Sequence, residues 1–205
     1  GIPPSIIESA TKQLGFPLGP IQLVDETSIE LGAKIARATR AAMGKSYPND
    51  QIDEILFWME DRGRLGRKTN AGFFNYNENG KREGFWTGLE EKYPLSKTTP
   101  NLTEVQHRLM FIQALEAVRA LEEGVLMDIR EGDVGAVLGW GFAPWSGGPL
   151  SWLDILGTPY AAERSQELCK TYGPRFDCPP LLADMGKNNE AFYERFSPEK
   201  LDKTF

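Results

Sequence analysis

The stretch "GFPLGPIQLVD" at residues 15–25 has a relative, "GFAPWSGGPLSWLD", at residues 141–154. Both contain Gly-Phe, then Pro, then Gly-Pro, an apolar pair and Asp, and the second carries three extra residues, Trp145, Ser146 and Gly147 in our alignment. Glycine allows a positive φ and close backbone approach, whereas proline fixes φ and begins helices. Each stretch therefore predicts a helix end, a tight turn and the start of another short helix.

A second similarity follows each turn in the same order. The segment "GRKTNAGFF" at residues 66–74 has a shortened echo, "GKNNEAFY", at residues 186–193. Matching segments in the same order indicate an internal duplication. We predict a first helical repeat over residues 1–95 and a second over residues 96–205.

Helix-type periodicity dominates the chain, and no segment of convincing length alternates as a strand does. Helices are predicted after Pro3-Pro4 as far as Gly15, from Pro20, over residues 28–43, after Asn49, over residues 103–123, from Asp128, and from Thr158-Pro159 to about Gly173. Residues 75–101 are rich in Asn, Gly, Lys, Glu, Thr and Pro, and we interpret them as a linker. The predicted fold class is all-α, built from a duplicated helical domain.

The helix predicted over residues 103–123 is apolar almost all round, which is typical of a helix buried at the centre of a domain. Its first residues, Thr103 to Gln106, have the form of a capping box. The first repeat has no counterpart of this helix. We therefore expect exposed apolar surface on the first repeat, unless a neighbouring chain covers it.

Composition and charge exclude several classes of protein. The 205 residues are 40% hydrophobic and 25% charged, which is typical of a globular protein, and the net charge of −6 argues against nucleic-acid binding. Cys169 and Cys178 lack the spacing of a zinc site and suit reduced thiols of a cytosolic protein. No apolar run is long enough for a membrane span and no secretory signal is present, so the expected location is cytoplasmic.

The first residue, Gly1, is not an initiator Met, which suggests an excised piece of a longer protein.

Few residues suggest chemistry of their own. His107 is the only histidine, and no carboxylate near it in sequence declares a catalytic pair, so we interpret it as a solvated or hydrogen-bonded side chain. Arg64, Arg67 and Lys68 lie in the Gly-rich loop and either face solvent or contact an anionic ligand tail. The Gly-Phe-Pro turn itself is either a tight corner between helices or a backbone wall that lines a ligand cleft.

Three segments together resemble the C-terminal helical domain of 3-hydroxyacyl-CoA dehydrogenases. These are "LGFPLGPIQLVDETSIELG" (14–32), "RLGRKTNAGFFNY" (64–76) and the second half from Glu104 to Asp154, which resembles the second copy of that domain. Tandem copies are typical of the multifunctional fatty-acid β-oxidation proteins, where an enoyl-CoA hydratase/isomerase part precedes the dehydrogenase part.

The resemblance implies NAD-dependent oxidation of a 3-hydroxyacyl-CoA to a 3-ketoacyl-CoA. It assigns NAD to a Rossmann domain outside this chain, so no cofactor and no metal is expected on the chain itself. The family's catalytic His–Glu pair and Asn also lie outside it, and no catalytic residue maps onto this sequence. The fragment alone is expected to be inactive.

The resemblance places one site on this chain. The family's Gly-Phe-Pro turn lies against the acyl end of the substrate, which makes five residues substrate-binding candidates: Phe16, Pro17, Leu18, Gly19 and Pro20. The first copy of the turn is expected to face the active site. The second copy is expected to pack against the first, as a dimer partner does in single-copy relatives.

Partners follow from the same resemblance: an acyl-CoA substrate, the N-terminal Rossmann and hydratase domains, a thiolase subunit and a second copy of the chain. Two other functions stay open. The chain could be a non-enzymatic helical module that binds an acyl-CoA or a partner protein, or a purely structural dimerisation module. Related dehydrogenases with other substrates use a similar helical domain.

Overall fold

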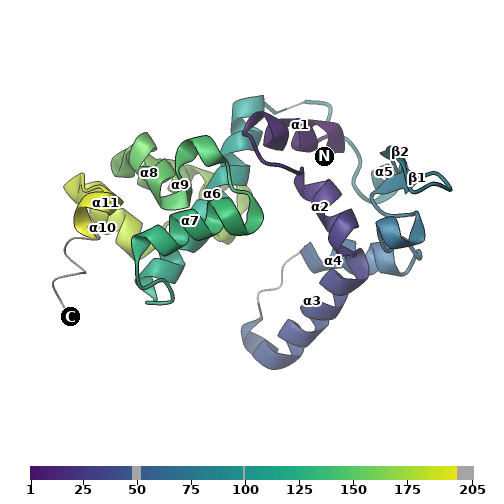
Figure 1. Ribbon diagram of the computed structural model, residues 1–205, viewed down its shortest axis with the longest axis horizontal. Helices are drawn as coiled ribbons and strands as arrows, with labels where there is room; N and C mark the ends of the chain where they lie inside the picture. Colours follow the sequence, from purple (N-terminus) through teal and green to yellow (C-terminus); the bar gives the residue numbers. More distant parts are fainter. Residues whose placement is uncertain (48–51, 99, 198–205) are drawn as a thin grey trace. The chain divides into compact units, whose positions relative to one another are not determined.

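The computed structural model describes residues 1–47, 52–98 and 100–197 (Figure 1). The chain divides into two compact units. Unit 1 consists of Gly1–Ser9 and Leu18–Pro100, and unit 2 consists of Ala10–Pro17 and Asn101–Phe205. None of the helices in the described ranges is both long and apolar enough to cross a membrane.

Nearly all the secondary-structure elements in the described ranges are helices. Unit 1 contains α2 (Pro20–Thr27), α3 (Ile29–Met43), α4 (Ile52–Glu60), β1 (Phe74–Tyr76), β2 (Arg82–Phe85) and α5 (Leu89–Lys92). Unit 2 contains α6 (Leu102–Glu122), α7 (Ile129–Trp140), α8 (Pro149–Leu156), α9 (Thr158–Tyr172), α10 (Pro180–Asn188) and α11 (Phe192–Arg195). Helix α1 (Pro4–Gln13) contributes residues to both units. Short 3₁₀ turns lie at Gly44–Ser46, Arg67–Thr69, Pro144–Ser146 and Pro174–Phe176. The all-α class is confirmed.

One small sheet interrupts the helices. Strands β1 and β2 form an antiparallel hairpin in which Phe74 pairs with Phe85 and Tyr76 pairs with Arg82. The prediction of a linker over residues 75–101 is wrong for residues 82–92, because this part of the chain forms β2 and α5 and contains the buried Leu89. Its few apolar side chains anchor it, because an otherwise polar segment folds when its aromatic rings find a hydrophobic surface.

Unit 2 is organised around the long helix α6, which packs against α7, α8 and α10. The prediction that this helix is central is confirmed. Its buried residues are Val105, Met110, Phe111, Ala114, Leu115 and Val118. The predicted capping box at its start is wrong, because the helix begins one residue earlier and Asn101 Oδ1 accepts the Thr103 N–H at 2.9 Å.

Unit 1 has the smaller core, which contains Ile29, Met59, Phe73, Phe74 and Leu89. Helix α3 buries Ile29, Ala33 and Ala36 on one face. On its other face Leu31 is 50% exposed and Ile35 is 58% exposed. The apolar surface expected on the first repeat is therefore present.

The duplication is visible in the backbone. Helices α2 and α8 each have 8 residues, and α3 and α9 each have 15. Between the paired helices, Ser28 has φ 88° and ψ 121°, and its counterpart Gly157 has φ 84° and ψ 127°. Asn70 and Asn189 adopt the left-handed region at φ 53° and 52°. Non-glycine residues rarely have positive φ, so these matches support a duplicated module.

Candidate functional site

Each Gly-Pro turn is held by a buried carboxylate. In the first repeat, Glu8 Oε1 accepts the backbone N–H groups of Ile21 and Gln22 at 2.8 and 3.1 Å. These groups lie in the first turn of α2, where backbone donors have no partner within the helix. A Cβ on Gly19 would lie 2.1 Å from the Glu8 carboxylate, so Glu8 can occupy this place only because residue 19 is glycine.

The second repeat has the same arrangement with a different acid. Asp133 accepts the N–H groups of Leu150 and Ser151 at 2.7 and 2.9 Å, and the Ser151 hydroxyl at 2.6 Å. A Cβ on Gly148 would lie 2.4 Å from the Asp133 side chain. In both copies the glycine of the Gly-Pro pair leaves room for a carboxylate that binds the start of the next helix.

A second carboxylate joins the end of that helix to the distant aromatic pair. Asp25, which is 1% exposed, accepts the N–H groups of Phe73 and Phe74 at 2.8 and 2.9 Å and the Tyr76 hydroxyl at 2.9 Å. Burial raises the pKa of Asp25 above its ordinary value, and the donated hydrogen bonds act in the opposite direction. A Cβ on Gly72 would lie 2.2 Å from Asp25 Oδ1.

The counterpart in the second repeat is Asp154. It accepts the N–H groups of Phe192 and Tyr193 at 2.6 and 3.1 Å. Burial again raises the pKa of this aspartate while the two N–H bonds lower it. The sequence shows that both aspartates stand at the end of their Gly-Pro motifs. It does not show that each aspartate binds backbone N–H groups far along the chain. In each repeat, the aspartate at the end of the Gly-Pro motif therefore has a structural role, because it joins the short helix to the aromatic pair far along the chain.

The five substrate-binding candidates divide between the units. Phe16 and Pro17 lie in unit 2, where the Phe16 ring packs edge-on against Phe142 at 5.5 Å. The Pro17 ring occupies the space beside Gly141, where a Cβ would approach it to 2.6 Å. Leu18, Gly19 and Pro20 lie in unit 1. These contacts are packing contacts, and substrate binding by this turn stays a prediction.

The three cations of the Gly-rich loop bind groups of unit 1. Arg64 donates to the carbonyl oxygens of Gly72 and Phe74 at 2.7 and 3.0 Å. These bonds join the start of the Gly-rich loop to its end. Arg67 Nη1 lies 3.0 Å from a carboxylate oxygen of Glu26. Lys68 forms an ion pair with Glu30. The structural interpretation of these residues thus has direct support in their partners.

His107 lies on α6, where Arg164 Nε donates to its Nδ1 over a long 3.4 Å. Burial lowers the pKa of His107, and the positive charge of Arg164 adds to this effect. Its ring packs edge-on against Phe111 at 5.9 Å. The neutral imidazole is a hydrogen-bonded packing residue, as the sequence predicts.

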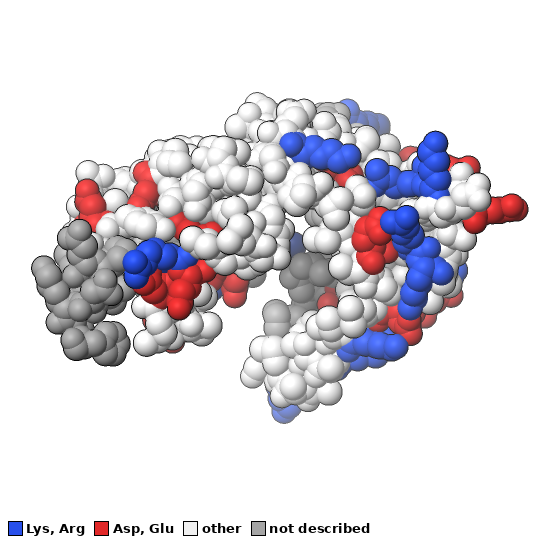
Figure 2. Space-filling view, in the orientation of Figure 1, with Lys and Arg blue, Asp and Glu red and all other residues white. Residues whose placement is uncertain are grey.

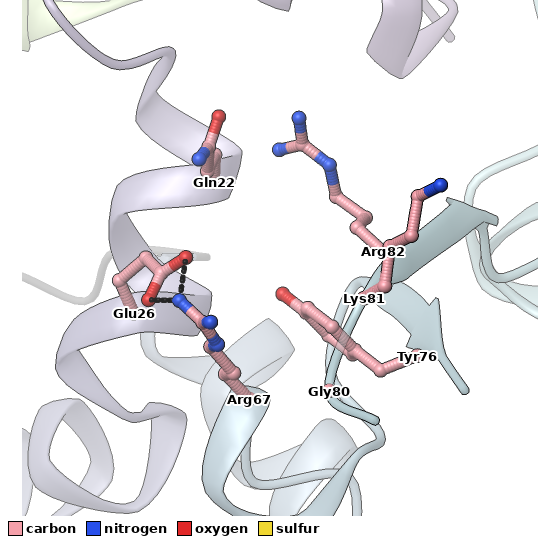
Figure 3. A pocket seen from close by; sticks show the side chains of 7 residues that line it. All are labelled: Gln22, Glu26, Arg67, Tyr76, Gly80, Lys81 and Arg82. Carbon is pink, nitrogen blue, oxygen red and sulfur yellow. Dashed lines mark hydrogen bonds and ion pairs between the residues drawn. The ribbon is translucent and has the colours of Figure 1, made fainter. Parts of the chain in front are cut away.

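A pocket of about 190 Å³ opens in unit 1 between α2 and the hairpin (Figure 3). Gln22 and Glu26 line it from α2, Arg67 from the Gly-rich loop, and Tyr76, Lys81 and Arg82 from the hairpin. Lys and Arg side chains gather over this part of unit 1, with acidic side chains between them (Figure 2). No sequence pattern predicts this pocket as a whole, although the basic pair Lys81-Arg82 after the turn at Gly80 indicates a local positive charge.

One family model matches the first part of the chain. Residues 1–76 match the family model of the 3-hydroxyacyl-CoA dehydrogenase C-terminal domain.

Two solved structures share the fold. The chain is similar to 3-hydroxybutyryl-CoA dehydrogenase from Escherichia coli K12, with a TM-score of 0.63 and 17% identity over 91% of this chain. It is also similar to the dehydrogenase part of multifunctional enzyme 1 from C. elegans, with a TM-score of 0.64 and 22% identity over 90% of this chain. The chain spans 55% and 42% of the lengths of those two chains. The resemblance is confirmed: residues 1–76 match the C-terminal domain of 3-hydroxyacyl-CoA dehydrogenases, and most of the chain shares its fold with these two dehydrogenases.

Proposed function

We propose that this chain is the substrate-side and packing part of an NAD-dependent 3-hydroxyacyl-CoA dehydrogenase of fatty-acid β-oxidation. The observation that carries the proposal is the family match over residues 1–76, which includes the whole Gly-Phe-Pro turn and the loop that Asp25 holds. The likeness to the dehydrogenase part of a multifunctional enzyme supports a protein with more than one activity, and the sequence resemblance suggests a hydratase part.

This chain contributes no step of hydride transfer. When NAD is bound in such an enzyme, it accepts the hydride from the hydroxyl-bearing carbon. A dinucleotide-binding fold needs parallel strands joined by helices. The sheet in the described ranges is a two-stranded antiparallel hairpin, so the residues present do not fit an NAD site.

The chain's own residues hold each part of the turn within its own unit. In unit 2, Phe16 packs against Phe142, and in unit 1, Glu8 binds the start of α2. In the proposed enzyme, Phe16, Pro17, Leu18, Gly19 and Pro20 contact the acyl end of the substrate.

The proposed partners follow from this role. They are an acyl-CoA, N-terminal Rossmann and hydratase domains, a thiolase subunit and a second copy of the chain. The cytoplasm stays the predicted location.

The proposal is tested on the native protein that contains this chain. An antibody raised against the chain captures it, and the captured protein is assayed for NADH oxidation with a 3-ketoacyl-CoA at 340 nm. We expect turnover by the captured protein and none by the isolated chain. Captured protein without turnover, together with acyl-CoA binding by the isolated chain, would instead identify a non-enzymatic binding module.

A further inference from the structure

We propose that the pocket between α2 and the β1–β2 hairpin of unit 1 binds a phosphoryl group, the phosphate or diphosphate of a small molecule. All the lining residues of the pocket belong to unit 1, and the proposal goes beyond the dehydrogenase proposal because its test measures binding and needs no turnover. Its volume of about 190 Å³ is several times the space that one water needs, so a tetrahedral oxyanion fits.

The charges around the pocket do not cancel. Arg67 is neutralised by Glu26, whose two carboxylate oxygens lie 3.2 and 3.0 Å from its Nη1. Lys81 and Arg82 have no carboxylate partner within the described part of the chain. The Arg82 guanidinium therefore faces a pocket whose one lining carboxylate is already paired, and Lys81 adds a second positive charge at its edge, which favours an anion.

Arg82 carries the strongest single observation. Its Nη1 is buried and has no hydrogen-bond partner. An unpaired buried donor on a charged group is costly, so native structures rarely leave one without a partner. Figure 3 shows its guanidinium extended toward Gln22 at the pocket. An oxyanion in the pocket would accept from the guanidinium of Arg82, and arginine is the side chain best suited to phosphate oxygens.

The guanidinium is also held in place before any ligand binds. It lies over the ring of Phe74 at 4.5 Å, and that ring stacks on Phe85 at 4.2 Å. Tyr76 completes the wall. Burial raises the pKa of Tyr76 well above its usual range, and the neighbouring Asp25 adds to the shift. The hydroxyl therefore stays neutral and adds no negative charge.

The second repeat shows that the fold does not need these residues. The positions of Gln22 and Glu26 on α2 are occupied by Ser151 and Ile155 on α8. The second aromatic pair, Phe192 and Tyr193, begins the short helix α11, whereas Phe74 of the first pair begins strand β1 of the hairpin. The basic pocket is thus an addition to the duplicated module, as expected for a binding site.

The test titrates the full chain with inorganic phosphate, pyrophosphate, coenzyme A and acetate at constant ionic strength by isothermal calorimetry. We expect pyrophosphate to bind and acetate to bind at least tenfold more weakly. Arg82→Gln should weaken pyrophosphate binding at least tenfold, because it removes a charged donor. Lys81→Gln should weaken it several-fold and should leave the fold intact, because the hydrogen bonds of Lys81 with Asn77 are made by its backbone.

Lys45→Gln is the matched control, since it removes one positive charge from an exposed position of unit 1 outside the pocket. It should change the affinity less than twofold. Tighter binding of coenzyme A than of pyrophosphate identifies the coenzyme as the source of the phosphate, and equal binding identifies a free phosphate. The proposal is overturned if no phosphate compound binds, if acetate binds equally well, or if Lys81→Gln and Arg82→Gln act no more strongly than Lys45→Gln.

Discussion

Replacing Asp25 by alanine should open unit 1 locally and leave unit 2 intact. The change removes the acceptor of two buried backbone donors, the N–H groups of Phe73 and Phe74. Each buried donor left without a partner costs about 1–3 kcal/mol, which together gives about 2–6 kcal/mol. The Tyr76 hydroxyl is left out of this sum because it borders the pocket and can bond to water.

We expect the loss of local stability in Asp25→Ala to lie in the lower part of this range of about 2–6 kcal/mol. Burial raises the pKa of Asp25, which means that the folded protein pays to keep this carboxylate ionised. Alanine removes that cost. We therefore expect the protection of the two amides to fall by about 2–4 kcal/mol, which is about 30-fold to several hundred-fold in exchange rate.

Amide hydrogen exchange measures this change at the bonds concerned. The amides of Phe73 and Phe74 should exchange faster in Asp25→Ala, while those of Phe192 and Tyr193, which bind Asp154 in unit 2, should be unchanged. The second repeat is thus an internal control within one sample. Less than a threefold change at the first pair would refute the account, and so would an equal change at both pairs.

Three further predictions test the structural interpretation of the repeat. Ser28→Gly should raise the free energy of unfolding by about 1–2 kcal/mol in urea denaturation, because Ser28 has φ 88° and a buried hydroxyl without a partner. Gly72→Ala should unfold the loop, since its Cβ would lie 2.2 Å from a buried carboxylate oxygen, and circular dichroism would record the loss. Lys34 and Lys68 lower the pKa of Glu30 to about 2, so its stabilising contribution is present above its ordinary value of 4.5 and lost as the pH falls through about 2. In Lys68→Gln a carbon-13 NMR titration should find the pKa of Glu30 raised.

The sequence predicts the repeated framework because its signals are local. Gly-Pro followed by apolar residues specifies a turn and a helix start within a few positions, and the structure places α2 and α8 where this pattern stands. The carboxylates that hold the turns were not predictable in the same way. Asp25 and Phe73 are 48 positions apart, and no local pattern indicates which backbone donors a buried acid will meet.

The hairpin and its pocket were missed for a different reason. Strands of three and four residues are too short for alternation to rise above chance, and their polar surroundings have the composition of a linker. One contact that anchors this segment joins Trp86 to Trp58, whose ring centroids lie 5.3 Å apart. That contact joins residues 28 positions apart in sequence, so it became visible only in the structure.

The comparison of α3 with α9 shows how the two copies have diverged. On α9, Arg164 pairs with Glu104 of α6, and Tyr160 packs edge-on against His107 at 6.5 Å. The corresponding positions of α3 are Leu31 and Ile35, which are exposed. An exposed leucine and isoleucine four residues apart on a helix form an apolar surface, and covering it with another apolar surface would be favourable. An element that packed on this face as α6 packs on α9 would therefore differ from α6: it would need apolar side chains at the two places where α6 presents a carboxylate and an imidazole.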